Sequence, residues 1–158
     1  MPKTNSHLIN LFNRQRLVSV KKSGLVEILA ELLEKEKAPA NFGLNIMLVR
    51  DPIIRIYHRD FMGIDTPTDV ISFPPDESDL SSATALEPAC GDVVLSVDFA
   101  KKYAETHALP ILEEVVRYAI HGSLHCLGFD DLTPHERRKM FTRQEKYVTS
   151  WRQKFLTK

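Results

Sequence analysis

The stretch from His121 to Asp131 reads HGSLHCLGFDD and places two histidines four positions apart. On an α-helix, side chains with this spacing project from one face, one turn above each other, so both imidazoles can reach one ion at about 2.0–2.1 Å. Gly128 is typical of the position just past a helix end, and the turn that it allows brings Asp131 back as a third ligand. Three protein ligands with a fourth position open are typical of a catalytic zinc site.

This spacing is also that of the metzincin metalloproteases, whose motif opens His-Glu-x-x-His-x-x-Gly and has its third ligand three residues further on. The glutamate of that motif is the general base for peptide hydrolysis. Gly122 stands at the corresponding position here, so we do not expect peptide hydrolysis by that route. Two histidines on an apolar helix can also be ordinary core residues, but the added glycine and acid at these spacings favour a metal site.

The composition predicts one soluble globular domain that spans residues 1–158, since 43% of the residues are apolar and 27% are charged. Twenty-one basic residues balance twenty-one acidic ones, so RNA would have to bind a local patch. The chain has no apolar run long enough to span a membrane and no signal-peptide pattern. We therefore expect a cytoplasmic protein without a membrane partner. Its two cysteines, Cys90 and Cys126, do not suggest a disulfide framework.

Hydrophobic periodicity divides the chain into short strands and amphipathic helices. Strands are predicted at residues 7–14, 44–49, 70–73 and 91–97. Helices are predicted at residues 23–36, from Asp51 as a cap to about Phe61, and from about Asp98 to a point before Pro110. Residues 41–43 are typical of a turn, and residues 75–89 of a mobile loop without periodicity.

Two further helices follow. The helix that begins at Pro110 is apolar on more than one side, so we expect it to be central and buried, and it carries both histidines. The last helix begins with the capping box Thr133-Pro-His-Glu136. It then becomes basic, and this run is either a solvated face or a contact for RNA. Its basic residues are Arg137, Arg138, Lys139, Arg143 and Lys146.

Three segments together resemble the YbeY family of bacterial endoribonucleases: the motif at residues 121–131, TDVISFP at residues 68–74 and GDVV at residues 91–94. The family pattern is H-G-x-L-H-L-x-G-Y-D-H, preceded by P-T-D-V-L-S-F and G-D-I, and the resemblance runs in order from about residue 44 to residue 150. It implies an α/β (α+β) fold, a single compact domain in which a small mixed sheet packs with helices. It also implies one Zn²⁺ per chain, or another divalent ion.

The chain departs from the family pattern at the third ligand, where the family has histidine and this sequence has Asp131. A carboxylate is an acceptable zinc ligand. It adds negative charge, so bound water should be less acidic than with three neutral imidazoles, and the site should shift towards harder ions. Asp130 and His135 are alternative third ligands.

A second departure concerns a cation. The family carries an arginine three residues before the aspartate that corresponds to Asp65, and this sequence has Met62 there. His58 stands where asparagine is usual. Methionine cannot stabilise the charge of a reacting phosphate. Arg59, one helical turn earlier, is our candidate for the missing catalytic cation.

The resemblance implies a metal-dependent, single-strand-specific endoribonuclease in which the ion polarises a phosphoryl oxygen or activates water. The expected role is ribosomal RNA maturation at the 16S 3′ end and ribosome quality control, with the small subunit and a ribosomal protein or assembly GTPase as partners. Thr68, Asp69 and Ser72 either line the substrate groove or belong to a core strand. The alternatives are a non-catalytic ribosome-associated assembly factor with a bound zinc and another metallohydrolase.

Overall fold

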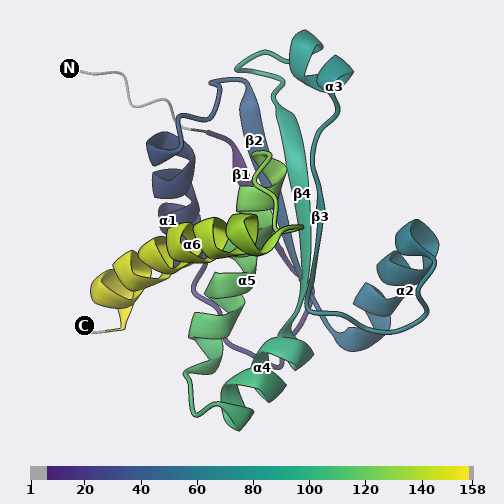
Figure 1. The fold of residues 1–158 in the computed structure, drawn as a ribbon, viewed down its shortest axis with the longest axis vertical. Coiled ribbons are helices and arrows are strands. Elements are labelled where there is room, and N and C mark those ends of the chain that lie inside the picture. The colour runs from purple at the N-terminus through teal and green to yellow at the C-terminus, as the bar shows by residue number, and fades with distance from the viewer. Residues whose placement is uncertain (1–6, 157–158) are drawn as a thin grey trace.

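Helix α5 (Ile111–Cys126) runs through the middle of the molecule in the computed structural model, which describes residues 7–156 (Figure 1). It contacts strands β3 and β4 and helices α1, α4 and α6. From Glu113 to Cys126 every residue of α5 is buried except Arg117, His121 and His125. These three lie four positions apart, so they form one stripe along the helix. The predicted central helix is confirmed, and its histidines lie on the stripe that is not covered.

The sheet has four strands in the order β1-β2-β4-β3. Strands β1 (Ile9–Asn13), β2 (Phe42–Val49) and β4 (Ala89–Ser96) are parallel, and β3 (Val70–Phe73) pairs antiparallel with β4 at one edge. The predicted small mixed sheet is therefore confirmed. Its antiparallel edge strand carries the TDVISFP segment and lies beside α5.

Helices cover the two faces of the sheet unequally. Helices α1 (Lys22–Lys35), α5 and α6 (Pro134–Phe155) lie on one face, where Leu44, Ile46 and Val93 alternate into the main core. Helix α2 (Asp51–Met62) lies on the other side of the sheet, where Ile54 belongs to a smaller cluster with strand residues (Figure 1). Helix α4 (Val97–Thr106) follows β4 directly and leads into α5.

Two glycines allow α5 to lie close to strand β4. A Cβ atom at Gly91 would lie 2.6 Å from the Cβ of Cys126, and one at Gly122 would lie 2.5 Å from Cγ1 of Val93. Real Cβ atoms do not approach other carbons so closely, because the interior is already packed to its van der Waals limit. The glycines of the GDVV and HGSLH segments thus set the distance between the central helix and the sheet.

The starts of α6 and α2 differ in how well the sequence predicted them. The Thr133 hydroxyl accepts a hydrogen bond from the Glu136 amide at 3.1 Å, which confirms the predicted cap of α6. The predicted cap by Asp51 is wrong, because Asp51 is already inside α2. The carboxylate of Asp98 accepts from the Asp51 amide at 2.7 Å instead, so the cap comes from a distant residue.

Two loop predictions also need correction. Residues 75–89 contain a short helix, α3 (Glu77–Ser82), which Asp76 caps by accepting a hydrogen bond from the Asp79 amide at 2.8 Å. The turn predicted at residues 41–43 ends earlier: the Phe42 amide donates to the Pro39 oxygen at 3.0 Å across a turn that includes Asn41, and β2 begins at Phe42 and pairs from there with β4. The glycine at position 43 serves close packing, since a Cβ there would lie 2.9 Å from the backbone oxygen of Leu8.

Both cysteines are free, as expected. Within residues 7–156, no helix has the length and apolar character needed to cross a membrane.

Candidate metal centre

The two histidines of α5 and Asp131 bring three ligand atoms together. The Nε2 atoms of His121 and His125 are 3.1 Å apart, and Oδ2 of Asp131 lies 3.6 Å and 3.5 Å from them. A tetrahedral zinc ion with bonds of about 2.0–2.1 Å holds its ligand atoms roughly 3.3–3.4 Å apart. The triangle therefore has the dimensions of one ion's coordination shell. Among the described residues this is the group with metal-binding geometry, and it includes neither Asp130 nor His135.

Hydrogen bonds fix the tautomers of both rings. Nδ1 of His121 lies 2.6 Å from Oε1 of Gln144, and Nδ1 of His125 lies 2.9 Å from the backbone oxygen of Phe129. Both partners are acceptors, so each Nδ1 carries the proton and donates, and each Nε2 presents a lone pair. Two lone pairs and a carboxylate at these distances repel one another, and a cation between them removes the repulsion. This donor set fits a divalent metal ion.

Burial favours the same protonation state. Desolvation lowers the pKa of His121, and the neighbouring His125 lowers it further, against the opposing effects of Gln144 and Asp131. A neutral imidazole is the form that binds metal, because the Nε2 lone pair is then free.

A left-handed turn after α5 places the third ligand. Gly128 has φ +97°, its amide donates to the His125 oxygen at 2.9 Å, and the Phe129 amide donates to the Leu124 oxygen at 3.1 Å. These are the two hydrogen bonds of a Schellman motif, which needs a residue at positive φ. The predicted helix end at Gly128 is confirmed. The same turn brings the Phe129 carbonyl to His125 and the Asp131 carboxylate to the triangle.

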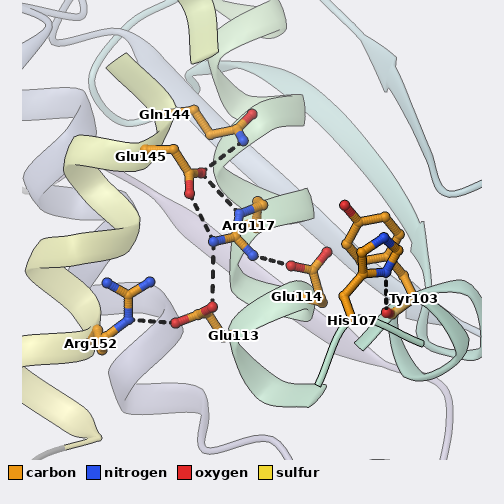
Figure 2. A network of polar contacts seen from close by, with 8 residues as sticks. All are labelled: Tyr103, His107, Glu113, Glu114, Arg117, Gln144, Glu145 and Arg152. Atoms are coloured by element: carbon orange, nitrogen blue, oxygen red, sulfur yellow. Dashed lines mark hydrogen bonds and ion pairs between the residues drawn. The ribbon is translucent and has the colours of Figure 1, made fainter. Parts of the chain in front are cut away.

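A network of outer partners holds Gln144 in place (Figure 2). Its Nε2 donates to Glu145 at 3.0 Å, and Arg117 donates to both oxygens of Glu145 at 2.9 Å and 2.8 Å. Burial raises the pKa of Glu145, but the hydrogen bonds from Arg117 and Gln144 outweigh it and lower that pKa overall. Glu145 is therefore a carboxylate that fixes which end of the Gln144 amide faces His121. Outer partners of this kind orient metal-binding histidines.

The centre opens into a cavity of about 600 Å³ between strand β3, the end of α5 and the following turn. Asp69 and Ser72, two of the predicted substrate-binding residues, line it together with Met62. The Ser72 hydroxyl also donates to the backbone oxygen of Gly122 at 3.1 Å, so it ties β3 to α5. The third predicted residue, Thr68, is not part of the lining, and its hydroxyl donates to Asp69 at 3.3 Å.

Arg59, the predicted catalytic cation, lies elsewhere. It is on helix α2, where its Nε pairs with the carboxylate of Asp60 at 2.9 Å, and it does not line the cavity. The cavity lining contains three aspartates and neither lysine nor arginine.

The packing around Gly122 argues against peptide hydrolysis by the metzincin route. A glutamate there would need a Cβ where Val93 already lies at 2.5 Å and the Ser72 hydroxyl at 3.0 Å. The position that supplies the general base in metzincins thus has no room for any side chain, because helix and sheet are in contact at this point.

Sequence analysis missed Gln144 and Arg117. Gln144 is buried on α6 between the apolar residues Met140 and Tyr147. A buried amide within an apolar stripe needs hydrogen-bond partners, and this was the signal that could have pointed to it. Arg117 lies one helical turn before His121 on the same stripe of α5, so helical spacing placed it near the site.

The chain is similar to known proteins in both sequence and fold. A sequence model of the family described as Endoribonuclease YbeY matches residues 10–152. Curated relatives include proteins named Endoribonuclease YbeY from Bacillus velezensis, 35% identical over 89% of this chain and 92% of the relative, and from Persephonella marina, 37% identical over 87% and 88%. The solution structure of TM1509 from Thermotoga maritima has a TM-score of 0.63 and 27% identity, and covers 95% of this chain and 93% of that one.

Proposed function

Because the chain belongs to the YbeY family, we propose that it is a zinc-dependent endoribonuclease that cleaves single-stranded RNA in ribosomal RNA maturation. One observation carries the proposal: two Nε2 lone pairs and a carboxylate converge with the spacing of a single ion, beside an open cavity. Three protein ligands that leave a position open support a catalytic rather than a purely structural centre.

The three candidate ligands have different roles at this centre. His121 and His125 present Nε2, and their Nδ1 protons are held by Gln144 and by the Phe129 oxygen. Asp131 supplies a negative charge that a third imidazole would not. When bound, a divalent ion provides a Lewis acid for a phosphoryl oxygen and for the attacking water.

The TDVISFP segment shapes the wall opposite the ligands. Oδ1 of Asp69 accepts from the Val70 amide at 2.7 Å, so the carboxylate is held at the start of β3. Ser72 is held by its hydrogen bond to Gly122. These two residues position the strand along the cavity, and we propose that the strand lies against the sugar–phosphate chain of the substrate.

The finer biological role follows from the family resemblance. We propose the 3′ end of 16S ribosomal RNA as the substrate region, with a further part in ribosome quality control. The partners would be the small ribosomal subunit and a ribosomal protein or assembly GTPase, in the cytoplasm.

One observation favours a second candidate, a non-catalytic assembly factor with a bound zinc. Met62 lines the cavity where the family pattern has arginine, and no lysine or arginine replaces it in that lining. Such a cavity attracts phosphate only through the ion.

Cleavage of a single-stranded ribosomal RNA fragment by zinc-loaded protein separates these candidates. The matched control is His121→Ala, purified in parallel and shown by circular dichroism to be folded. Cleavage by the wild-type protein that disappears in the control supports a metal-dependent nuclease. Tight RNA binding without cleavage by either protein supports the assembly factor. Equal cleavage by both proteins overturns the assignment and indicates a contaminating nuclease.

A further inference from the structure

The cleft at the metal centre continues beyond the metal ligands. A second cavity, of about 580 Å³, lies between α4, α5 and α6. It shares Asp69, Val70, His121 and Asp131 with the first cavity, so the ligands stand at the junction of the two. An RNA strand whose phosphate lies at the metal centre therefore has room to continue in this direction.

Both cavities carry carboxylates, but they differ in basic residues. The first is lined by three aspartates without a lysine or arginine, whereas the second has two arginines beside its four acidic residues, and one of the two is Arg137. Arg137 is exposed, and within residues 7–156 its side chain forms no ion pair or hydrogen bond. The other arginine of this cavity, Arg117, is already engaged by Glu113, Glu114 and Glu145 (Figure 2). Arg137 is thus the cation in this cavity that is available to a phosphate.

Aromatic and apolar side chains complete the second cavity. Phe141 and Tyr103 line it with 61% and 44% of their surface exposed. The Tyr103 ring stacks on His107 with centroids 3.8 Å apart, and Nδ1 of His107 hydrogen-bonds the Tyr103 backbone oxygen at 2.8 Å (Figure 2). Met140 adds a buried apolar surface. Exposed aromatic rings beside a cation are the combination that single-stranded nucleic acids use, because bases stack and phosphates pair.

We propose that this second cavity binds the nucleotide next to the cleaved bond, with its base against Phe141 and Tyr103 and its phosphate at Arg137. The proposal rests on the proposed ribonuclease function and names the subsite by which substrate is held. Stacking accepts every base, so the subsite selects single-stranded RNA and not a sequence. Arg137 takes over the attraction for phosphate that Met62 does not provide.

The test uses the zinc-loaded full chain and a fluorescein-labelled single-stranded RNA octamer of mixed sequence. Anisotropy gives Kd, and cleavage of a longer fragment gives kcat and KM. The variants are Arg137→Ala and Phe141→Ala. The matched controls are Arg138→Ala and Lys139→Ala, on the same helix, whose side chains line a separate cavity. All four residues are exposed, so the substitutions leave the core intact.

We expect Phe141→Ala to weaken binding by about 5- to 150-fold and Arg137→Ala by about 10-fold. Arg137→Ala should also lower the slope of log Kd against log salt by about 0.7, the value for one phosphate of a single strand. KM should rise while kcat changes little, because neither residue touches the reacting atoms. The controls should stay within about twofold.

Each other outcome has a definite meaning. If the wild-type protein cleaves RNA and both variants match it in Kd and KM, the subsite is wrong and the proposed function stands. If all three basic variants weaken binding equally and Phe141→Ala does not, the attraction is diffuse and the subsite is again wrong. If the wild-type protein neither binds nor cleaves RNA, both proposals fail.

Discussion

The side-chain oxygen of Gln144 lies 2.6 Å from Nδ1 of His121, although the two residues are on different helices. Because the same amide donates to Glu145, it cannot turn without losing a hydrogen bond. The helix pair α5–α6 thus sets the tautomer and the direction of one imidazole of the candidate metal site. Zinc affinity, RNA cleavage and the stability of the fold should depend on this contact and on others between side chains.

We expect Gln144→Leu to lower zinc affinity by about 10- to 100-fold, the usual cost of removing an outer partner of a metal-binding histidine. Leucine has a similar volume but cannot accept the hydrogen bond that Nδ1 of His121 donates. Competition with a chromophoric chelator at pH 7 measures the change. Thr142→Ala, an exposed position on the same helix, is the control and should bind zinc like the wild-type protein. Unchanged affinity in Gln144→Leu would mean that the ring is oriented by packing alone.

Substitution should distinguish Asp131 from its neighbour Asp130 as the third ligand. Asp131 has its Oδ2 within 3.6 Å of both Nε2 atoms, whereas Asp130 is outside this group. Asp131→Ala should therefore reduce zinc affinity by more than the roughly 10- to 100-fold that outer partners contribute. Asp130→Ala should change it by less than about threefold. Calorimetric titration with zinc measures both, and a larger loss in Asp130→Ala would contradict the assignment.

A cation restored at position 62 should increase RNA cleavage. Met62 lines the metal cavity and is half exposed, so Met62→Arg can place a guanidinium beside the reacting phosphate without disturbing the core. We expect kcat/KM to rise about tenfold, the effect of one charge-assisted hydrogen bond. Arg59→Ala is the companion variant, because Arg59 is the candidate cation from the sequence.

The two variants answer separate questions about the catalytic cation. A tenfold loss in Arg59→Ala would indicate that Arg59 leaves Asp60 to reach the substrate. No change in Arg59→Ala would show that this position is not catalytic. A loss of activity in Met62→Arg would mean that the cavity needs an apolar wall here.

Gly122→Ala should destabilise the fold by about 1–3 kcal/mol, the usual cost of overpacking. The new Cβ would lie 2.5 Å from Cγ1 of Val93, so α5 and β4 must move apart. Urea unfolding followed by circular dichroism measures the free energy of unfolding. The double variant Gly122→Ala/Val93→Ala lacks the colliding methyl group. Its free energy of unfolding should therefore fall by less than the sum of the losses in the two single variants. Strict additivity would show that the contact is not the cause.

Cys126 should make the stability of the protein fall at alkaline pH. Burial raises the pKa of the Cys126 thiol to about 12, whereas an unfolded cysteine has a pKa of about 8.5. Because the native pKa is raised, the contribution of the neutral Cys126 thiol to the stability of the fold is complete below pH 8.5 and is lost as the pH rises toward 12. The loss should be about 1.4 kcal/mol per pH unit within that window.

The measurement compares urea unfolding of the wild-type protein and Cys126→Ala from pH 8 to pH 10. The alanine variant has no thiol to ionise in the unfolded state, so its free energy of unfolding should fall less steeply. Parallel curves for the two proteins would contradict a buried neutral thiol at this position.

The three candidate metal ligands could be grouped from the sequence because they are close together in it. His121 and His125 follow the helical repeat, and the Schellman turn at Gly128 has a local signal in glycine. The central helix and the cap at Thr133 were likewise found from periodicity and a local motif, which depend on residues within a few positions of one another. The mixed sheet was implied by the resemblance to the family.

The features that sequence analysis missed depend on tertiary contacts. Gln144 meets His121 only because α6 packs on α5, and Asp98 caps α2 only because β4 and β2 are neighbours. Gly43 has the appearance of a turn residue, but its role is to let the backbone of Leu8 approach. A single sequence does not state which helix lies against which strand, so such roles became visible only in the assembled fold.

The left-handed turn at Gly128 divides the three candidate ligands between two parts of the fold. His121 and His125 belong to the central helix, whereas Asp131 follows the turn and is partly exposed. We therefore expect an ion at this site to leave by outward motion of the short segment around Asp131 while both imidazoles stay in place, so that a chelator would remove the ion without unfolding the protein.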